Sequence, residues 1–127
     1  MKKLFKLLKF DDKGLIPAVI QDARTKRVLT LCYMSREAFT ISLKSGLVYV
    51  FRRSQGKLMM KGARSGCVQR IKRVSIDCEG KSLLFTVDQV KAACHEGYFT
   101  CYFRYLDKRM SVKVSGKRMF DPDKVYK

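Results

Sequence analysis

Residues 15–52 read LIPAVIQDARTKRVLTLCYMSREAFTISLKSGLVYVFR, and this stretch decides the fold. Three short segments rich in Val, Ile, Leu, Tyr and Phe predict strands, at 15–21, 27–33 and 47–52. Between the last two, Ser35 can cap a helix that runs to Lys44 or its neighbour, and Gly46 supplies the stop signal. The stretch therefore predicts strands and a helix that pack together.

The rest of the chain predicts further short strands. Segment 54–66 has three glycines in thirteen residues, which predicts a basic loop around a short strand at 57–60. Beyond it, the apolar pattern predicts hairpin arms at 74–76 and 83–87, helical turns within 87–93, strands at 99–106 and 110–114, and a loose tail at 120–127. We therefore expect one α+β domain over residues 1–127, β-rich, with roughly seven strands and one or two helices.

The first ten residues, MKKLFKLLKF, gather their apolar side chains on one helical face. This pattern predicts a helix or strand that packs on the core; a membrane-surface helix is the alternative, for which ten residues is short. Lys6 and Lys9 interrupt the apolar run, and no small-residue cleavage site follows, so we interpret the segment as part of a cytoplasmic protein. No apolar stretch reaches the roughly 18 residues that a membrane-spanning helix needs.

The chain is strongly basic, with 28 Lys and Arg against 11 Asp and Glu, a net charge of +17. Such an excess predicts contact with something anionic, such as a nucleotide, a nucleic acid or a membrane surface. Aromatic residues lie among the basic ones at 98–105, which suits single-stranded nucleic acid. The basic residues are spread along the whole chain, however, and no known nucleic-acid motif is present. A zinc-stabilised nucleic-acid-binding protein therefore stays open as one alternative.

Five cysteines, an odd number, argue against a disulfide framework and favour metal binding or plain burial. Three of them lie near predicted turns and strand ends: Cys78, Cys94 and Cys101, with His95 beside the second. Three thiolates can hold a zinc ion and leave its fourth position open for a water molecule that ionises near neutral pH. The spacing of 16 and then 7 residues is equally compatible with three buried structural cysteines.

Several motifs together resemble one enzyme family. They follow one another as LIPAVIQD (15–22), VLTLCYMSREA (28–38), KG-x-x-SG-x-x-Q (61–69), DCE (77–79), ACHEG (93–97) and Cys101. In order and spacing, over residues 10–103, they resemble phosphoribosyl-AMP cyclohydrolase. The resemblance implies an intertwined homodimer that opens the adenine ring of 1-(5-phosphoribosyl)-AMP at the N1–C6 bond in histidine biosynthesis.

The resemblance also implies roles for individual residues. One zinc ion per subunit would be held by Cys78 of one subunit and by Cys94 and Cys101 of the other. Magnesium would lie at the acidic turn, which here reads Asp77, Glu79 and Lys81. Substrate binding falls to Arg53, Ser54, Lys61, Ser65 and Gln69. His95 is the candidate catalytic proton shuttle, because histidine exchanges protons near neutral pH. Arg53, Lys61, Arg64 and Arg70 offer charge for the two phosphates of the substrate.

The chain departs from the family pattern at several of these positions. Lys81 replaces a carboxylate, and Glu79 is one methylene longer than the usual Asp. A magnesium site that loses a carboxylate and gains an ammonium should bind the ion far less well. Lys81 either takes the place of the ion or points into solvent. With Ala63 and Glu96, these substitutions leave open a divergent enzyme that acts on another nucleotide.

Overall fold

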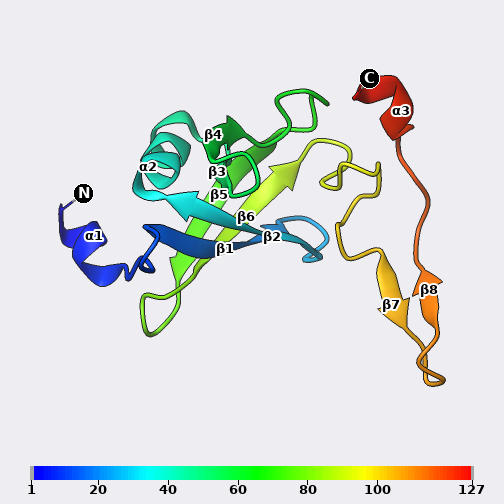
Figure 1. Ribbon diagram of the computed structural model, residues 1–127, viewed down its shortest axis with the longest axis horizontal. Helices are drawn as coiled ribbons and strands as arrows, with labels where there is room; N and C mark the ends of the chain where they lie inside the picture. Colours follow the sequence, from blue (N-terminus) through cyan, green and yellow to red (C-terminus); the bar gives the residue numbers. More distant parts are fainter. Residues whose placement is uncertain (1, 127) are drawn as a thin grey trace.

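The computed structural model describes residues 2–126, and its centre is a four-stranded sheet (Figure 1). The sheet has the order β2-β1-β6-β5 and comprises β1 (Leu15–Asp22), β2 (Val28–Ser35), β5 (Gln69–Ile76) and β6 (Leu83–Gln89). Strand β1 runs antiparallel to β2 and parallel to β6, and β6 forms an antiparallel hairpin with β5. The expected β-rich α+β domain is confirmed.

The helix and hairpin beside the sheet follow from local sequence signals. Helix α2 (Arg36–Ser45) begins where the Ser35 hydroxyl oxygen accepts a hydrogen bond from the Ala38 N–H, and it ends at Gly46 in the left-handed region. Strands β3 (Tyr49–Arg52) and β4 (Lys57–Met60) pair antiparallel. These bounds confirm the predicted helix and the predicted short strand at 57–60.

The core forms where α2 meets the sheet. Phe39 of α2 is fully buried and packs edge-on against Phe85 of β6, with ring centroids 6.3 Å apart. Phe5 of helix α1 (Lys2–Leu7) also packs edge-on against Phe39, at 5.9 Å. Edge-to-face geometry suits aromatic rings because the positive edge of one meets the negative face of the other. The prediction that the first ten residues pack on the core is therefore confirmed.

Two predicted elements between residues 87 and 106 are wrong. The helical turns expected within 87–93 are absent, because β6 continues to Gln89 and Val87 pairs with a neighbour on each side. The strand expected at 99–106 is reduced to β7 (Arg104–Leu106). Its first half bends, because the Thr100 hydroxyl donates to the Val28 carbonyl oxygen and the Cys101 N–H donates to the Leu29 carbonyl oxygen.

The last part of the chain is more ordered than predicted. Strand β8 (Val112–Val114) pairs antiparallel with β7, and this hairpin projects away from the central sheet (Figure 1). The expected loose tail contains a short helix, α3 (Pro122–Val125), which Asp121 caps by accepting a hydrogen bond from the Asp123 N–H. The described residues therefore hold three helices instead of one or two.

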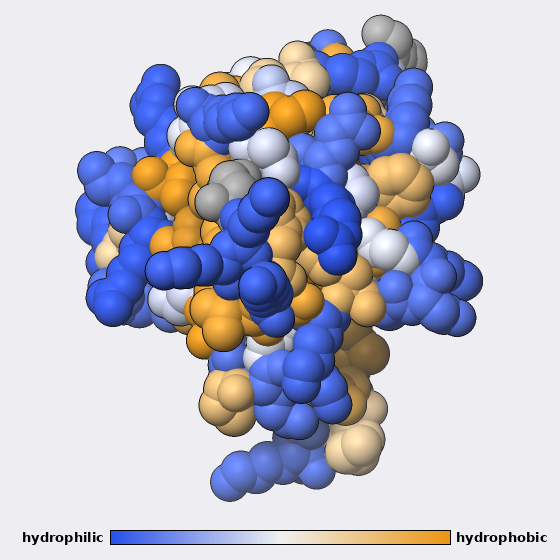
Figure 2. Space-filling view, turned by 90° about the vertical axis from the view of Figure 1, so that its left-hand side faces the viewer, coloured by the Kyte–Doolittle hydropathy of each residue, from blue (hydrophilic) through white to orange (hydrophobic). Residues whose placement is uncertain are grey.

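The surface agrees with the even spread of charge along the sequence. Hydrophilic side chains cover the face that carries α1 from edge to edge, with separate apolar patches between them (Figure 2). No helix within residues 2–126 has the length and hydropathy to cross a membrane.

Replacing Phe39 with alanine should lower the free energy of unfolding by about 3–5 kcal/mol, because it removes the ring between Phe5 and Phe85 and leaves a cavity. Urea denaturation followed by circular dichroism measures this change. Lys44→Ala, at an exposed position of the same helix, is the matched control and should shift the midpoint little. Equal effects of the two substitutions would contradict this description of the core.

Candidate functional site

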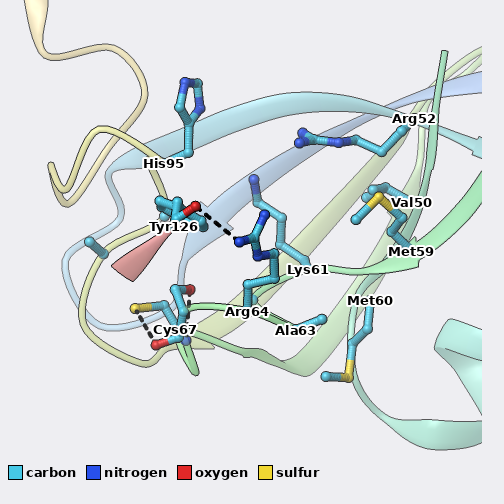
Figure 3. A pocket seen from close by; sticks show the side chains of 14 residues that line it. Val50, Arg52, Met59, Met60, Lys61, Ala63, Arg64, Cys67, His95 and Tyr126 are labelled. Carbon is cyan, nitrogen blue, oxygen red and sulfur yellow. Dashed lines mark hydrogen bonds between the residues drawn. The ribbon is translucent and has the colours of Figure 1, made fainter. Parts of the chain in front are cut away.

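A pocket lies where the β3–β4 hairpin, the loop after β4 and the loop after β6 meet (Figure 3). Its volume is about 90 Å³, and a wider hollow of about 420 Å³ adjoins it. The pocket and the hollow share five of their lining residues: Arg52, Met59, Arg64, His95 and Tyr126. The pocket therefore combines a hairpin, two loops and the segment that carries α3.

Three cations converge on this pocket. Arg52 ends β3, Lys61 follows β4, and Arg64 lies in the next loop; their side chains point toward one another in Figure 3. Within residues 2–126 the two ion pairs are Lys72–Asp88 and Lys81–Glu79, so none of the three has a carboxylate partner there. The exposed Asp123 lines the adjoining hollow, so cations outnumber acids around the site. Such an excess favours an anionic ligand, and arginine suits phosphate in particular.

His95 stands at the rim of this pocket, directly after a buried thiol. Its side chain is exposed, whereas Cys94 is only 4% exposed. The loop is fixed by backbone hydrogen bonds: the Cys94 N–H donates to the Tyr98 carbonyl oxygen, and the Gly97 N–H donates to the Cys94 carbonyl oxygen. The only histidine of the chain is therefore held in place by a tight turn.

Two of the three predicted zinc ligands lie side by side. Burial raises the pKa of the Cys94 thiol, the Glu96 N–H that points at its sulfur lowers it, and the neighbouring Cys101 thiol raises it further. Cys32 lies near as well, but burial raises the pKa of its thiol to about 12 despite the nearby Lys61 ammonium. Cys32 is therefore held in its neutral form, in which its sulfur donates to the Ala18 carbonyl oxygen.

The third predicted ligand lies elsewhere in the chain. Cys78 is exposed in the turn before β6, whereas Cys94 follows the other end of that strand. The seven residues of β6 alone span roughly 20 Å. Within residues 2–126, no three His, Cys, Asp or Glu side chains come close enough to hold a metal ion. The chemistry of the Cys94–Cys101 pair fits zinc, but one chain supplies only these two sulfurs to the site.

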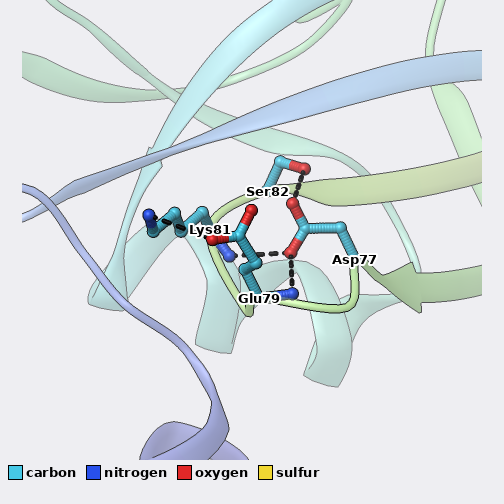
Figure 4. A network of polar contacts seen from close by, with 4 residues as sticks. All are labelled: Asp77, Glu79, Lys81 and Ser82. Atoms are coloured by element: carbon cyan, nitrogen blue, oxygen red, sulfur yellow. Dashed lines mark hydrogen bonds and ion pairs between the residues drawn. The ribbon is translucent and has the colours of Figure 1, made fainter.

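The acidic turn uses its carboxylate for its own structure (Figure 4). One oxygen of Asp77 accepts hydrogen bonds from the backbone N–H groups of Glu79 and Lys81, and the other accepts from the Ser82 hydroxyl. The Ser82 bond and then the Lys81 N–H hold the pKa of Asp77 below its usual value. The Lys81 ammonium pairs with Glu79 at 3.2 Å, out in the solvent.

The predicted substrate residues separate into two groups. Lys61 and Ser65 line the pocket. Arg53 instead lies over the Tyr33 ring at 3.9 Å, Ser54 is exposed in the turn after β3, and Gln69 is buried with its amide donating to Gln89. The pocket also holds Arg64, whose charge the sequence singled out.

Among the charged and aromatic residues that line the pocket, the sequence reasoning did not single out Arg52 and Tyr126. Arg52 is the last residue of β3 and directly precedes Arg53 and Ser54, which were predicted to bind substrate, so its neighbours were the available signal. Tyr126 belongs to a segment that the sequence predicts as a loose tail and carries no such signal.

Comparisons with known proteins agree on one family. A family model described as phosphoribosyl-AMP cyclohydrolase matches residues 30–103. A protein of Methanospirillum hungatei JF-1 named phosphoribosyl-AMP cyclohydrolase is 45% identical over 94% of this chain and 88% of its own length. A histidine biosynthesis bifunctional protein HisIE from Thermoanaerobacter pseudethanolicus is 44% identical over 99% of this chain, which spans 58% of that longer protein.

Asp77→Asn should destabilise the fold at neutral pH and do so less in acid. The folded-state pKa of Asp77 is lowered from 3.8, so its contribution is present above that value and is lost as the pH falls through the folded-state pKa. Urea denaturation of the wild type and the variant across this pH range measures their difference in free energy of unfolding, which should become smaller as the pH falls. Asp12→Asn, at an exposed position without side-chain hydrogen bonds, serves as the control. A difference independent of pH would contradict the role assigned to Asp77.

Proposed function

Because the chain belongs to the phosphoribosyl-AMP cyclohydrolase family, a family of hydrolases, we propose that it opens the adenine ring of 1-(5-phosphoribosyl)-AMP at the N1–C6 bond in histidine biosynthesis. The observation that carries this proposal is the convergence of Arg52, Lys61 and Arg64 on a pocket with His95 at its rim. A cluster in which cations outnumber acids suits a substrate with two phosphates. We place the reaction in the cytoplasm.

The cations orient the substrate in this proposal. Lys61 and Arg64 lie on the loop side of the pocket and Arg52 on the hairpin side, so a nucleotide phosphate between them is held from two directions. Fixing the phosphate places the purine ring in a defined position relative to His95. The same contacts contribute to binding the ground state and the transition state alike, so their removal should act mainly on KM.

The chemistry at the ring is assigned to the cysteines and to His95. Cys94 and Cys101, with Cys78 of the partner subunit, would hold a zinc ion, which when bound activates the water that attacks C6. The Glu96 N–H directed at the Cys94 sulfur stabilises the thiolate form that such a ligand needs. His95 would pass the proton released by this water to ring nitrogen N1 as the N1–C6 bond breaks, because His95 lines the pocket and histidine is a common proton carrier in catalysis.

The position of Cys78 supports a homodimer. A ligand at the opposite end of β6 from Cys94 can reach the other two only from a second chain. Apolar surface for such a contact is available on β2 and around the β7–β8 hairpin, where large hydrophobic side chains are exposed: Val28, Leu31, Tyr102, Tyr105, Leu106, Met110, Val112 and Val114. A hairpin that projects from the body, as in Figure 1, suits an intertwined pair.

The acidic turn offers less support for a magnesium site than the cysteines offer for a zinc site. The Asp77 carboxylate already accepts three hydrogen bonds, and Glu79 is paired with Lys81. We propose that Lys81 supplies the positive charge at this turn, so that the reaction depends little on magnesium. The ion pair between Lys81 and Glu79, although exposed to solvent, supports this role because it keeps the ammonium at the turn.

The pure protein should open the ring of phosphoribosyl-AMP when supplied with zinc, and magnesium should change the rate little. His95→Gln should lower kcat by about 10²- to 10⁴-fold, because the proton carrier is lost. Zinc should remain bound, because His95 is not one of the proposed zinc ligands. The change in adenine absorbance follows the reaction. Turnover of AMP or another nucleotide with phosphoribosyl-AMP left intact would favour the divergent enzyme instead.

Zinc content tests the ligand set separately. Each wild-type chain should carry about one zinc ion, as three thiolates and one water require. Replacing Cys78, Cys94 or Cys101 with serine should remove the metal, and the dimer should weaken with it. Cys67→Ser is the matched control and should leave the zinc content unchanged, because Cys67 is not one of the three predicted ligands. Atomic absorption and light scattering give the two readouts, and zinc retained in Cys94→Ser would overturn the assignment.

A further inference from the structure

Segment 119–126, here called the strap, lies outside residues 30–103 that match the family model, yet it lines the pocket. Its first contact is with the loop of His95. The Met119 N–H donates to the Gly97 carbonyl oxygen at 2.6 Å. Gly97 has a φ of 93°, and a Cβ there would run into the Phe120 carbonyl oxygen. The strap therefore packs on this loop by backbone contact that only glycine permits.

The second contact of the strap is with Arg64, on the opposite side of the pocket. One terminal nitrogen of the Arg64 guanidinium donates to the Tyr126 carbonyl oxygen at 3.0 Å, the bond drawn in Figure 3. The guanidinium carbon also lies 5.6 Å from the centre of the Tyr126 ring. The Phe120 ring lies 6.0 Å from that of Tyr126, so the two ends of the strap support each other.

Arg64 needs such support. It lies in an exposed loop between Gly62 and Gly66, both of which have positive φ, and it has no carboxylate partner among the described residues. A long side chain on a glycine-rich loop loses much rotamer freedom when it binds a ligand. A guanidinium carries five N–H donors, and the bond to Tyr126 uses one, so the others stay available. The strap restricts Arg64 and leaves most of its donors free.

We propose that Tyr126 is a positioning residue that holds the Arg64 guanidinium over the pocket, where it binds a phosphate group of the nucleotide. The identity of the nucleotide rests on the proposed function; the phosphate contact of Arg64 does not. The ring of Tyr126 acts through Arg64 and does not touch the base. Pre-organisation of this kind strengthens binding because the cost of ordering Arg64 is met before the ligand arrives.

The test compares AMP with adenosine, which lacks the phosphate, by isothermal titration calorimetry on the full chain. Tyr126→Ala keeps the backbone carbonyl that accepts from Arg64 but removes the ring that lies against the guanidinium and against Phe120. With Arg64 less restricted, AMP binding should weaken about three- to tenfold and adenosine binding should stay unchanged. Tyr126→Phe keeps the ring and should restore wild-type affinity. Lys124→Ala, exposed on α3 and absent from the pocket, is the control. Thermal unfolding monitors the fold of each variant.

A double-mutant cycle separates positioning from a general structural role. Arg64→Ala should weaken AMP binding at least as much as Tyr126→Ala does, and adding Tyr126→Ala to it should have no further effect. In the ring-opening assay, Tyr126→Ala should raise KM by the same factor with kcat nearly unchanged. Additive effects, an equal loss of adenosine binding, or no phosphate-dependent binding by the wild type would overturn the proposal. Phosphate-dependent AMP binding without ring opening would refute the proposed reaction alone.

Discussion

The position of β6 is the constraint on which the rest of the structure depends. This strand pairs with β1 on one side and with β5 on the other, so it cannot shift without breaking both ladders. Its alternate residues Leu83, Phe85 and Val87 are buried in the core. The loops at its two ends carry Cys78 and Cys94, which the strand thereby holds apart. A central strand held on both sides thus gives a physical reason why the three proposed zinc ligands do not meet within one chain.

The surplus basic side chains are found in two kinds of environment. Arg52, Lys61 and Arg64 converge on the pocket, and none of them forms an ion pair with an acid among the described residues. Other cations lie over aromatic rings of the same chain, as Arg53 does over Tyr33 and Arg118 over Tyr98. Of the aromatic residues at 98–105 that suggested stacking with nucleic-acid bases, Tyr98 and Phe103 are engaged internally, because their rings stack at 3.9 Å, whereas Tyr102 and Tyr105 are exposed.

Sequence reasoning succeeded where the signal is local and failed where distant contacts decide. Ser35 and Gly46 fix the ends of α2 through hydrogen bonds within one turn, so the helix could be predicted. The segment at 99–106 has a strand pattern, but bonds from Thr100 and Cys101 to β2 bend it. The pocket residues divide in the same way into predictable and unpredictable ones. A sequence motif indicated Lys61, whereas Tyr126 lines the pocket only because the end of the chain folds back onto it.

The two loops that carry the cysteines are braced in the same way by opposite ends of the described chain. Gly80, in the turn with Cys78, has positive φ and lies so close to the Leu7 carbonyl that a Cβ would collide with it; its own carbonyl accepts from the Lys9 N–H at 2.7 Å. Gly97, in the loop with Cys94, meets the strap by the same kind of contact. Backbone packing at glycine leaves little room for adjustment. The termini thus stabilise the two halves of the proposed metal site from outside the family's motifs.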